Sequence, residues 1–201
     1  RGRLAVPWSR VTYDDTAWNS GPGPHGQGIA GMGTNVSGVV GITPSLYTRI
    51  VFNASATDAA DATPLQLLVD YDDSFVAYLN GVEVARSNLQ QPNTFVPRTA
   101  VATGTRNYAG APTTFVIDPA KNVLVAGPNV LAIQVHNVSI ADPDVAIKAD
   151  LRIGTAGTQL VANNSPAWRY MVGSVEPVVD VDGAIEDNPD APPSVNDWVE
   201  L

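Results

Sequence analysis

The sequence contains no cysteine and only two histidines, His25 and His136. Without cysteine there are no disulfide bonds and no thiolate metal sites, so disulfide-stapled scaffolds and zinc fingers are excluded. Neither histidine belongs to an HExxH or HxH pattern, so two imidazoles on one metal ion are not indicated. The fold must therefore be stabilised by packing.

Patterns of membrane spans and of several enzyme classes are also missing. No apolar run approaches the roughly 18 residues that cross a bilayer, and no charged start followed by an apolar segment indicates a retained signal peptide. No GxSxG elbow, P-loop or strand-linked GxGxxG is present, so acyl transfer and nucleotide chemistry lack their usual anchors. We therefore expect no membrane insertion and no catalytic site.

Positive charge is scarce. The net charge is −9, from 11 basic and 20 acidic residues, and eight of the acids lie from Glu176 onward, where no Lys or Arg occurs. Binding to phosphates needs a clustered positive surface, so nucleic acid is not an expected partner. The acidic, proline-rich end of the chain is typical of a solvated linker.

Turn-forming residues are abundant: 17 Gly and 16 Pro divide the sequence into short segments with little helical periodicity. Short segments separated by turns are typical of β-sandwiches and barrels. We expect strands at 46–53, 64–71, 75–80, 82–86, 113–118, 129–137, 145–153 and 168–172. Seven or eight strands predict an all-β fold, a two-sheet antiparallel β-sandwich.

Two further segments have a clear local interpretation. NVLAIQVHN (129–137) is apolar on both alternating faces, which predicts an inner strand. The segment 21–41 contains too much glycine for regular structure and is expected to be a long loop, and loops of that length are often functional.

The stretch LLVDYDDSFVAYLNGVEVAR (67–86) combines two apolar runs, an acidic pair and an Asn-Gly dipeptide. Asn80-Gly81 favours a type I′ hairpin, whose two central residues need positive φ. Asp72 and Asp73 are interpreted first as the corner of a sheet, since aspartate caps its own backbone in turns, and second as metal ligands. A glycosidase acid pair is not indicated, because adjacent strand residues project to opposite sides.

Several of these segments together resemble a known family. WSRVTYDDTAWNSGPGPHGQG, SLYTRIVFN, LLVDYDDSFVAYLNGVEVARSN, AGPNVLAIQVHN and DPDVAIKADLRI look like galactose-binding-like jelly-roll modules of large secreted bacterial proteins, related to carbohydrate-binding modules. The resemblance covers roughly residues 8–153. It implies a jelly-roll sandwich and a noncatalytic extracellular or cell-surface module for glycan binding, adhesion or spacing.

The resemblance also implies a domain organisation. We expect a jelly-roll module over 1–160 whose first strand is missing ahead of Trp8, and an acidic tail over 161–201 with a candidate strand at 167–177. That strand would complete its own module or a neighbouring one, because a sandwich lacking a strand exposes unpaired backbone groups. The alternative function is a subunit that assembles head to tail into filaments. The assembly residues would be Trp168, Tyr170, Val172 and Trp198.

Loops rich in aspartate make calcium the metal that suits this sequence best. Calcium takes about six to eight oxygen ligands from carboxylates, carbonyls and water. The candidate ligands are Asp14, Asp15, Asp70, Asp72, Asp73, Asp142 and Asp144. The resemblance adds that such jelly rolls often hold a structural calcium ion.

Glycan binding by this class combines an aromatic platform with a few hydrogen-bonding groups at the loop end of the sandwich. Tyr108 is the expected platform because GTRNYAGAP is typical of a loop, and Arg106, Asn107 and Arg49 are the candidates for bonds to sugar hydroxyls. Large aromatic residues are usually well buried. We expect burial for three of them, Trp8, Trp18 and Trp168.

Overall fold

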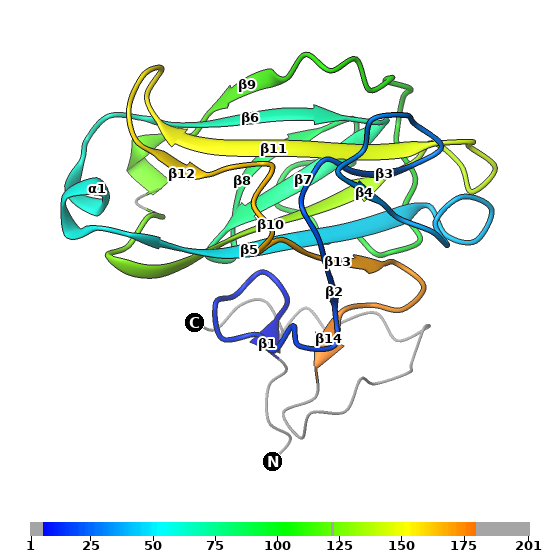
Figure 1. Cartoon of the computed structure of the whole chain (residues 1–201), viewed down its shortest axis with the longest axis horizontal. Coiled ribbons are helices and arrows are strands. Elements are labelled where there is room, and N and C mark those ends of the chain that lie inside the picture. Colours follow the sequence, from blue (N-terminus) through cyan, green and yellow to red (C-terminus); the bar gives the residue numbers. More distant parts are fainter. Residues whose placement is uncertain (1–5, 122, 180–201) are drawn as a thin grey trace.

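Two β-sheets packed face to face form the structure (Figure 1), a computed structural model that describes residues 6–121 and 123–179. The first sheet has the order β2 (Asn19–Ser20), β13 (Arg169–Val172), β5 (Ser45–Ala54), β10 (Gly127–His136), β7 (Ser74–Leu79) and β8 (Val82–Ser87). The second has the order β4 (Thr34–Asn35), β3 (His25–Gln27), β11 (Val145–Ile153), β6 (Leu65–Tyr71) and β9 (Thr113–Val116), and β12 (Gln159–Val161) pairs with β11. The expected all-β sandwich is confirmed, with one parallel pair, β3 and β4, among its described pairings.

Alternate residues of the central strands fill the space between the sheets. The fully buried members of this core include Leu46, Leu67, Val69, Phe75, Leu79, Leu131, Ile133, Val135 and Leu151. The described helices, α1 (Ala56–Ala60) and η1 (Pro119–Lys121), are short, and none of them is long and apolar enough to cross a membrane. Packing between the sheets therefore stabilises the fold, and the loops between strands are left at its two ends.

The outer face of the first sheet is covered as well. Two apolar clusters cover it, one of Trp8, Tyr13, Trp18, Tyr47, Val130 and Ala132 and the other of Val76, Val96 and Ala100. In these clusters, side chains of the N-terminal segment 7–18 and of the loop 88–112 pack on outward-facing residues of β5, β7 and β10. β10 is consequently buried from Asn129 to His136, which confirms the predicted inner strand.

Asn80 and Gly81 form the turn between β7 and β8, with φ angles of 52° and 82°. Both angles are positive, as the predicted type I′ hairpin requires. The Asn80 side chain also donates a hydrogen bond to the carbonyl of Val123 and accepts one from the N–H of Val130. The turn therefore also holds the start of β10.

The glycine-rich segment 21–41 is a loop except at β3 and β4, so the prediction of a loop throughout was wrong at these two places. It contains β3 and β4, which extend the second sheet beside β11. A Cβ atom on Gly26 would lie 2.5 Å from the carbonyl oxygen of Val145, so a side chain there would prevent this close approach. Strands this short are held by backbone pairing and carry no apolar alternation that a sequence pattern would reveal.

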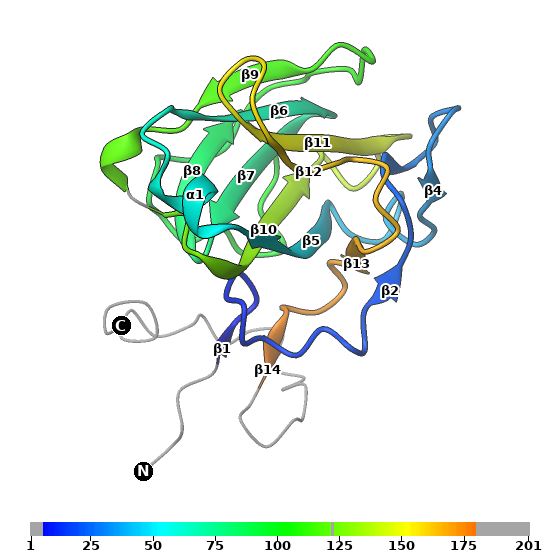
Figure 2. The ribbon, with the colours of Figure 1, turned by 60° about the vertical axis from the view of Figure 1, so that its left-hand side comes forward.

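The described part of the segment 161–201 lies on the same sandwich. β13 pairs with β5, with Val172 opposite Leu46, and Trp168 is buried in the main core, while Tyr170 and Val172 pack against it. In this structure the candidate strand lies in its own sheet, between β5 and the short edge strand β2. Beyond it, β14 (Val178–Val179) pairs with β1 (Val6–Pro7), as Figure 2 shows. Trp198 lies outside the described residues, and self-association stays a prediction.

Candidate functional site

Three loops meet where β6 ends and β11 begins. Residues 72–73 join β6 to β7, residues 137–144 join β10 to β11, and residues 88–112 join β8 to β9. The N–H of Asp72 donates to the carbonyl of Ala146 at 3.0 Å, which ties the first loop to β11. We call this region the acidic corner, defined by Asp70, Asp72, Asp73, Asp142 and Asp144.

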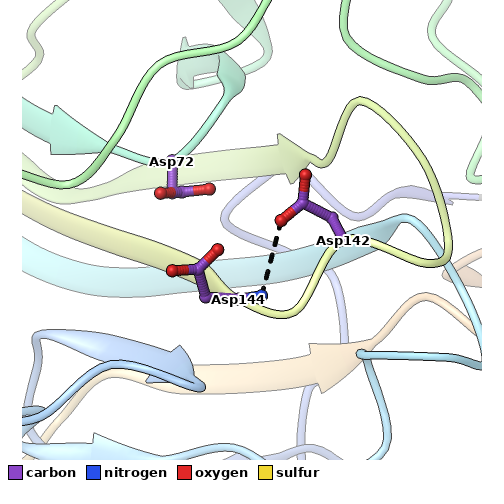
Figure 3. A group of neighbouring side chains, drawn as sticks. All are labelled: Asp72, Asp142 and Asp144. Carbon is purple, nitrogen blue, oxygen red and sulfur yellow. Dashed lines mark hydrogen bonds between the residues drawn. The ribbon is translucent and has the colours of Figure 1, made fainter.

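Three of these carboxylates converge. Each of Asp72, Asp142 and Asp144 offers an oxygen, and these oxygens lie within 4.8 Å of one another. Figure 3 shows the three side chains around a common space, with the N–H of Asp144 donating to Asp142 Oδ1 at 3.5 Å. Among the residues that the structure describes, no basic side chain forms an ion pair with any of the three. This acidic triad can hold a metal ion.

Repulsion and burial both act on the triad. Burial raises the pKa of Asp72 to about 6, against a hydrogen bond from the N–H of Tyr108, and the charges of Asp144, Asp73 and Asp142 raise it further. Burial also raises the pKa of Asp142, with Asp144 adding to the effect. A cation between the carboxylates would relieve this repulsion, because an opposite charge favours the ionised form.

Asp73, although adjacent to Asp72, has a structural role. Its Oδ1 accepts the N–H of Arg106 at 2.9 Å, and its Oδ2 accepts the N–H of Val138 at 2.7 Å. Both oxygens thus anchor backbone of the two neighbouring loops. Asp72 thus lies in the candidate metal site, whereas Asp73 holds the two neighbouring loops in place beside it.

The Arg106 side chain makes its contacts within the acidic corner. Its Nη2 lies 2.9 Å from the buried carboxylate of Asp70, and its guanidinium stacks over the ring of Tyr71, 4.0 Å from the centroid. It donates a further hydrogen bond to the carbonyl of Tyr71. Arg106 therefore fastens the loop to the sheet, and its predicted role as a sugar ligand is not what its contacts favour.

The residues after Arg106 stand beside the triad. The N–H of Tyr108 donates to Asp72 Oδ2 at 3.1 Å, Asn107 is exposed, and the Tyr108 side chain is half-buried. Burial raises the pKa of Tyr108, with the charge of Asp70 adding to the effect. Of the predicted glycan ligands, the structure places Asn107 and Tyr108 next to the triad.

Arg49 lies elsewhere, on the outer face of the first sheet, with 1% of its surface exposed. It donates to the carbonyls of Trp8 and Arg10 and forms an ion pair with Asp15. Asp14 is exposed and accepts the N–H of Thr16 at 3.0 Å. These three predicted ligands do not join the others: Arg49 and Asp15 hold the N-terminal segment, and Asp14 shapes a turn.

The predicted burial of tryptophan is confirmed. Trp8, Trp18 and Trp168 are 7%, 6% and 2% exposed. Trp8 lies edge-on to Tyr47 at 5.0 Å between ring centroids. These rings are part of the packing and are not available as a platform for a ligand.

Sequence reasoning missed how the loop 101–112 is held on the corner. The chain offers a weak signal for it: Asp70 in β6 and Asp72 just after that strand lie two residues apart, a spacing that directs both side chains to the same side of an extended chain. What covers that side is decided by backbone N–H groups some 36 positions away, such as that of Tyr108. Because every residue except proline has a backbone N–H, the residue types do not indicate which N–H groups will donate to these carboxylates.

No family model and no curated protein matches this chain. Its fold is similar to that of an α-L-rhamnosidase from Streptomyces avermitilis complexed with L-rhamnose (TM-score 0.45, 14% identity, 85% of this chain and 14% of that one). It is also similar to that of the apo lectin of Pleurotus ostreatus (TM-score 0.40, 14% identity, 85% of this chain and 38% of that one). A third similar structure is the PA14 domain of the MpAFP antifreeze protein (TM-score 0.37, 14% identity, 78% of this chain and 73% of that one). This chain thus spans 14% and 38% of the length of the first two proteins. Its assignment to the β-sandwiches rests on the strands and pairings described above.

Proposed function

We propose that this domain is a noncatalytic glycan-binding module of an extracellular bacterial protein, with calcium at the acidic corner as part of the binding site. The observation that carries the proposal is the convergence of Asp72, Asp142 and Asp144 within 4.8 Å beside the loop that holds Asn107 and Tyr108. Three carboxylates without a basic partner repel one another, and a cation relieves this repulsion whereas a neutral sugar does not.

Calcium suits the donor set. Its ligands are oxygens of carboxylates, carbonyls, side-chain amides and water, and the triad supplies carboxylates from two loops. Asn137 adds a buried amide whose Oδ1 has no hydrogen-bond partner, while its Nδ2 donates to the carbonyl of Asp144 at 2.8 Å. Asp72, Asp142 and Asp144 would hold the ion, which would supply positive charge for hydroxyl oxygens.

The loop supplies the rest of a sugar site. The half-buried ring of Tyr108 offers an apolar face, and the exposed amide of Asn107 can both donate and accept hydrogen bonds. Sites of this kind combine an aromatic surface with a few polar groups that fix orientation. Arg106 keeps both residues in place through Asp70 and Tyr71.

An extracellular setting is consistent with this site. Calcium sites of extracellular modules work at about 10⁻⁴ to 10⁻³ M, far weaker than intracellular sites. Two of the three carboxylates, those of Asp142 and Asp144, are only half-buried, which favours weak binding of this order. Glycoside hydrolysis by the domain would contradict the noncatalytic part of the proposal.

The first test is isothermal titration of calcium into chelator-stripped protein. We expect one site for the unmodified chain and its loss in Asp142→Asn, which removes a charge from the triad. The matched control is Asp14→Asn, an exposed carboxylate on the N-terminal segment, which should bind like the unmodified chain. Absence of binding heat together with an unchanged melting temperature would end the calcium proposal.

The second test is a glycan array probed with and without calcium. Binding should need calcium and should be lost in Tyr108→Ala, because the ring is the apolar half of the site. Phe95→Ala is the control, since Phe95 is another aromatic residue with 38% of its surface exposed. Equal losses in the two variants, or binding that ignores calcium, would contradict this site.

A further inference from the structure

The segment 173–179, which we call the C-terminal strap, runs from the end of β13 across the outer side of the first sheet to β14. Its first residue extends the ladder, with the N–H of Gly173 donating to the carbonyl of Ser45 at 2.9 Å. The Gly173 carbonyl accepts the hydroxyl of Thr43 at 2.8 Å and Nη1 of Arg98 at 3.4 Å. The strap therefore contacts both the sheet and the loop 88–112.

Glu176 is the polar contact at the middle of the strap. Its Oε1 accepts the backbone N–H of Arg98 at 2.5 Å, and its Oε2 accepts the hydroxyl of Tyr47 at 3.2 Å. Gln134 Nε2 donates to the same Tyr47 hydroxyl at 2.8 Å and to the carbonyl of Val96 at 3.1 Å. One carboxylate thus joins the strap to β5 and to the loop, and the Tyr47 hydroxyl links it onward to Gln134 of β10.

The docked strap leaves polar groups unsatisfied. Ser45 Oγ, beside Gly173, and Arg98 Nε are buried without a hydrogen-bond partner. The two donors to Glu176 are neutral, a backbone amide and a phenol, while the Arg98 guanidinium bonds to Gly173. Partial burial of the Glu176 carboxylate and burial of two unpartnered polar atoms oppose docking, because water would satisfy all of them.

We propose that the C-terminal strap is a pH-sensitive closure: it docks more firmly when Glu176 is protonated and opens locally when Glu176 is ionised. Opening would expose the hydroxyl of Tyr47 and the amide of Gln134 and would release the pairing of β14 with β1. The inference is independent of the glycan site, which lies at the acidic corner.

The sign follows from the surroundings of Glu176. Burial raises its pKa, and the hydrogen bonds from Arg98 and Tyr47 and the charge of Arg98 only partly oppose that shift. Within residues 6–121 and 123–179, those two residues, from the loop and from β5, are the charged and titratable groups that act on it, and Gln134 of β10 is neutral. A docked state with a raised pKa binds the proton more tightly, so docking is fully favoured below the ordinary pKa and weakens as pH rises through the raised one.

Amide hydrogen exchange, corrected for intrinsic rates, tests the closure on the full chain. The amides of Gly173 and Arg98 report on the strap, and those at the centre of β10 report on global unfolding. We expect strap protection to fall between pH 5 and pH 8 by about tenfold for each unit by which docking raises the pKa, while β10 stays unchanged. Glu176→Gln should keep high protection at both pH values.

Glu83→Gln is the matched control, because Glu83 pairs with Arg86 away from the strap. It should show the pH dependence of the unmodified chain. Tyr47→Phe, which removes one donor to the ionised Glu176, should lower strap protection at pH 8 and make its pH dependence steeper. The proposal is overturned if strap protection in the unmodified chain does not change with pH, or if the protection of β10 falls together with that of the strap. It is also overturned if Glu176→Gln loses strap protection at both pH values.

Discussion

The chain contains the dipeptide Asp-Asp twice near a tyrosine, at 14–15 and at 72–73, and the two copies have opposite surroundings. In the first, Asp15 neutralises the buried guanidinium of Arg49, and Asp14 is exposed in a turn. In the second, Asp73 accepts two backbone N–H groups, and Asp72 faces two further carboxylates. One pair is electrostatically satisfied by the protein itself, and the other is not.

The difference shows where function can reside. A carboxylate that compensates a buried arginine is part of the fold, because a buried ion pair that loses one partner leaves an uncompensated charge. A carboxylate held against other carboxylates has a raised pKa, and groups of that kind gather at functional sites. The acidic corner is therefore the place to look for a ligand, and the N-terminal segment is not.

Breaking the first pair should have the largest effect on stability. Asp15→Ala leaves the Arg49 guanidinium, of which 1% of the side chain is exposed, without its counter-charge. We expect a loss of about 3 to 5 kcal/mol in the free energy of unfolding, the usual cost of orphaning a buried charge. Urea denaturation followed by tryptophan fluorescence would measure it, since Trp8 and Trp18 belong to the same segment as Asp15.

The control for that experiment is Asp61→Ala, an exposed aspartate that also accepts an N–H two residues later, from Thr63. Its midpoint should stay close to that of the unmodified chain. If Asp15→Ala were equally mild, Arg49 would not depend on Asp15, and the contrast between the two pairs would disappear.

Calcium should stabilise the domain through the second pair and leave the first untouched. At a concentration one hundred times the dissociation constant, a ligand that binds the folded state adds about 2.7 kcal/mol. We expect that gain in calorimetric melting of the unmodified chain and of Asp14→Asn, and its absence in Asp142→Asn. In chelator, Asp142→Asn should melt slightly higher than the unmodified chain because one repulsive charge is gone.

Much of the fold could be predicted from the sequence, because alternation of apolar residues is a local property. The inner strand β10 and the Asn80-Gly81 turn follow from residue types that permit few alternatives. β3 was missed because three residues held by backbone pairing carry no such pattern. The sequence does not determine the place of β13, since pairing with β5 depends on which strand edge is free.

The site was predictable only in part, because charge compensation is decided by long-range contacts. Aspartates at 72, 142 and 144 stood among the candidates, but so did those at 14, 15 and 73, and no local feature separates them. Its residue type makes Arg49 an equally plausible sugar ligand, but its contacts place it with Trp8 and Arg10 and not at the acidic corner. Its partner Asp15 lies 34 positions away in the chain.

The pH dependence of stability should distinguish the two Asp-Asp pairs in the metal-free protein. The pKa of Asp72 is raised to about 6 in the folded protein, so the protonated Asp72 carboxyl stabilises the folded state at low pH. This contribution is lost as pH rises through that value. Asp72→Asn has no such loss. Its stability relative to the unmodified chain should therefore rise between pH 5 and pH 7, with roughly a tenfold change in the ratio of unfolding equilibrium constants.

Asp14→Asn is the counterpart in the first pair, measured in the same buffers with chelator present. Hydrogen bonds from Thr16 hold the pKa of Asp14 below its ordinary value, so this carboxylate is ionised throughout that range. Its stability difference from the unmodified chain should be flat between pH 5 and pH 7. A flat profile for Asp72→Asn as well would mean that the acidic corner is as well compensated as the N-terminal segment.

The smallest expected effect separates the two functions of Asp14, charge and turn formation. Asp14 is exposed, and its carboxylate accepts the N–H of Thr16 at 3.0 Å, a bond that the amide oxygen of asparagine can also accept. Asp14→Asn should therefore melt like the unmodified chain, whereas Asp14→Ala should melt slightly lower because the turn loses its acceptor. Equal drops in both variants would show that the charge of Asp14 matters, and Arg49 would then depend on both aspartates of the first pair.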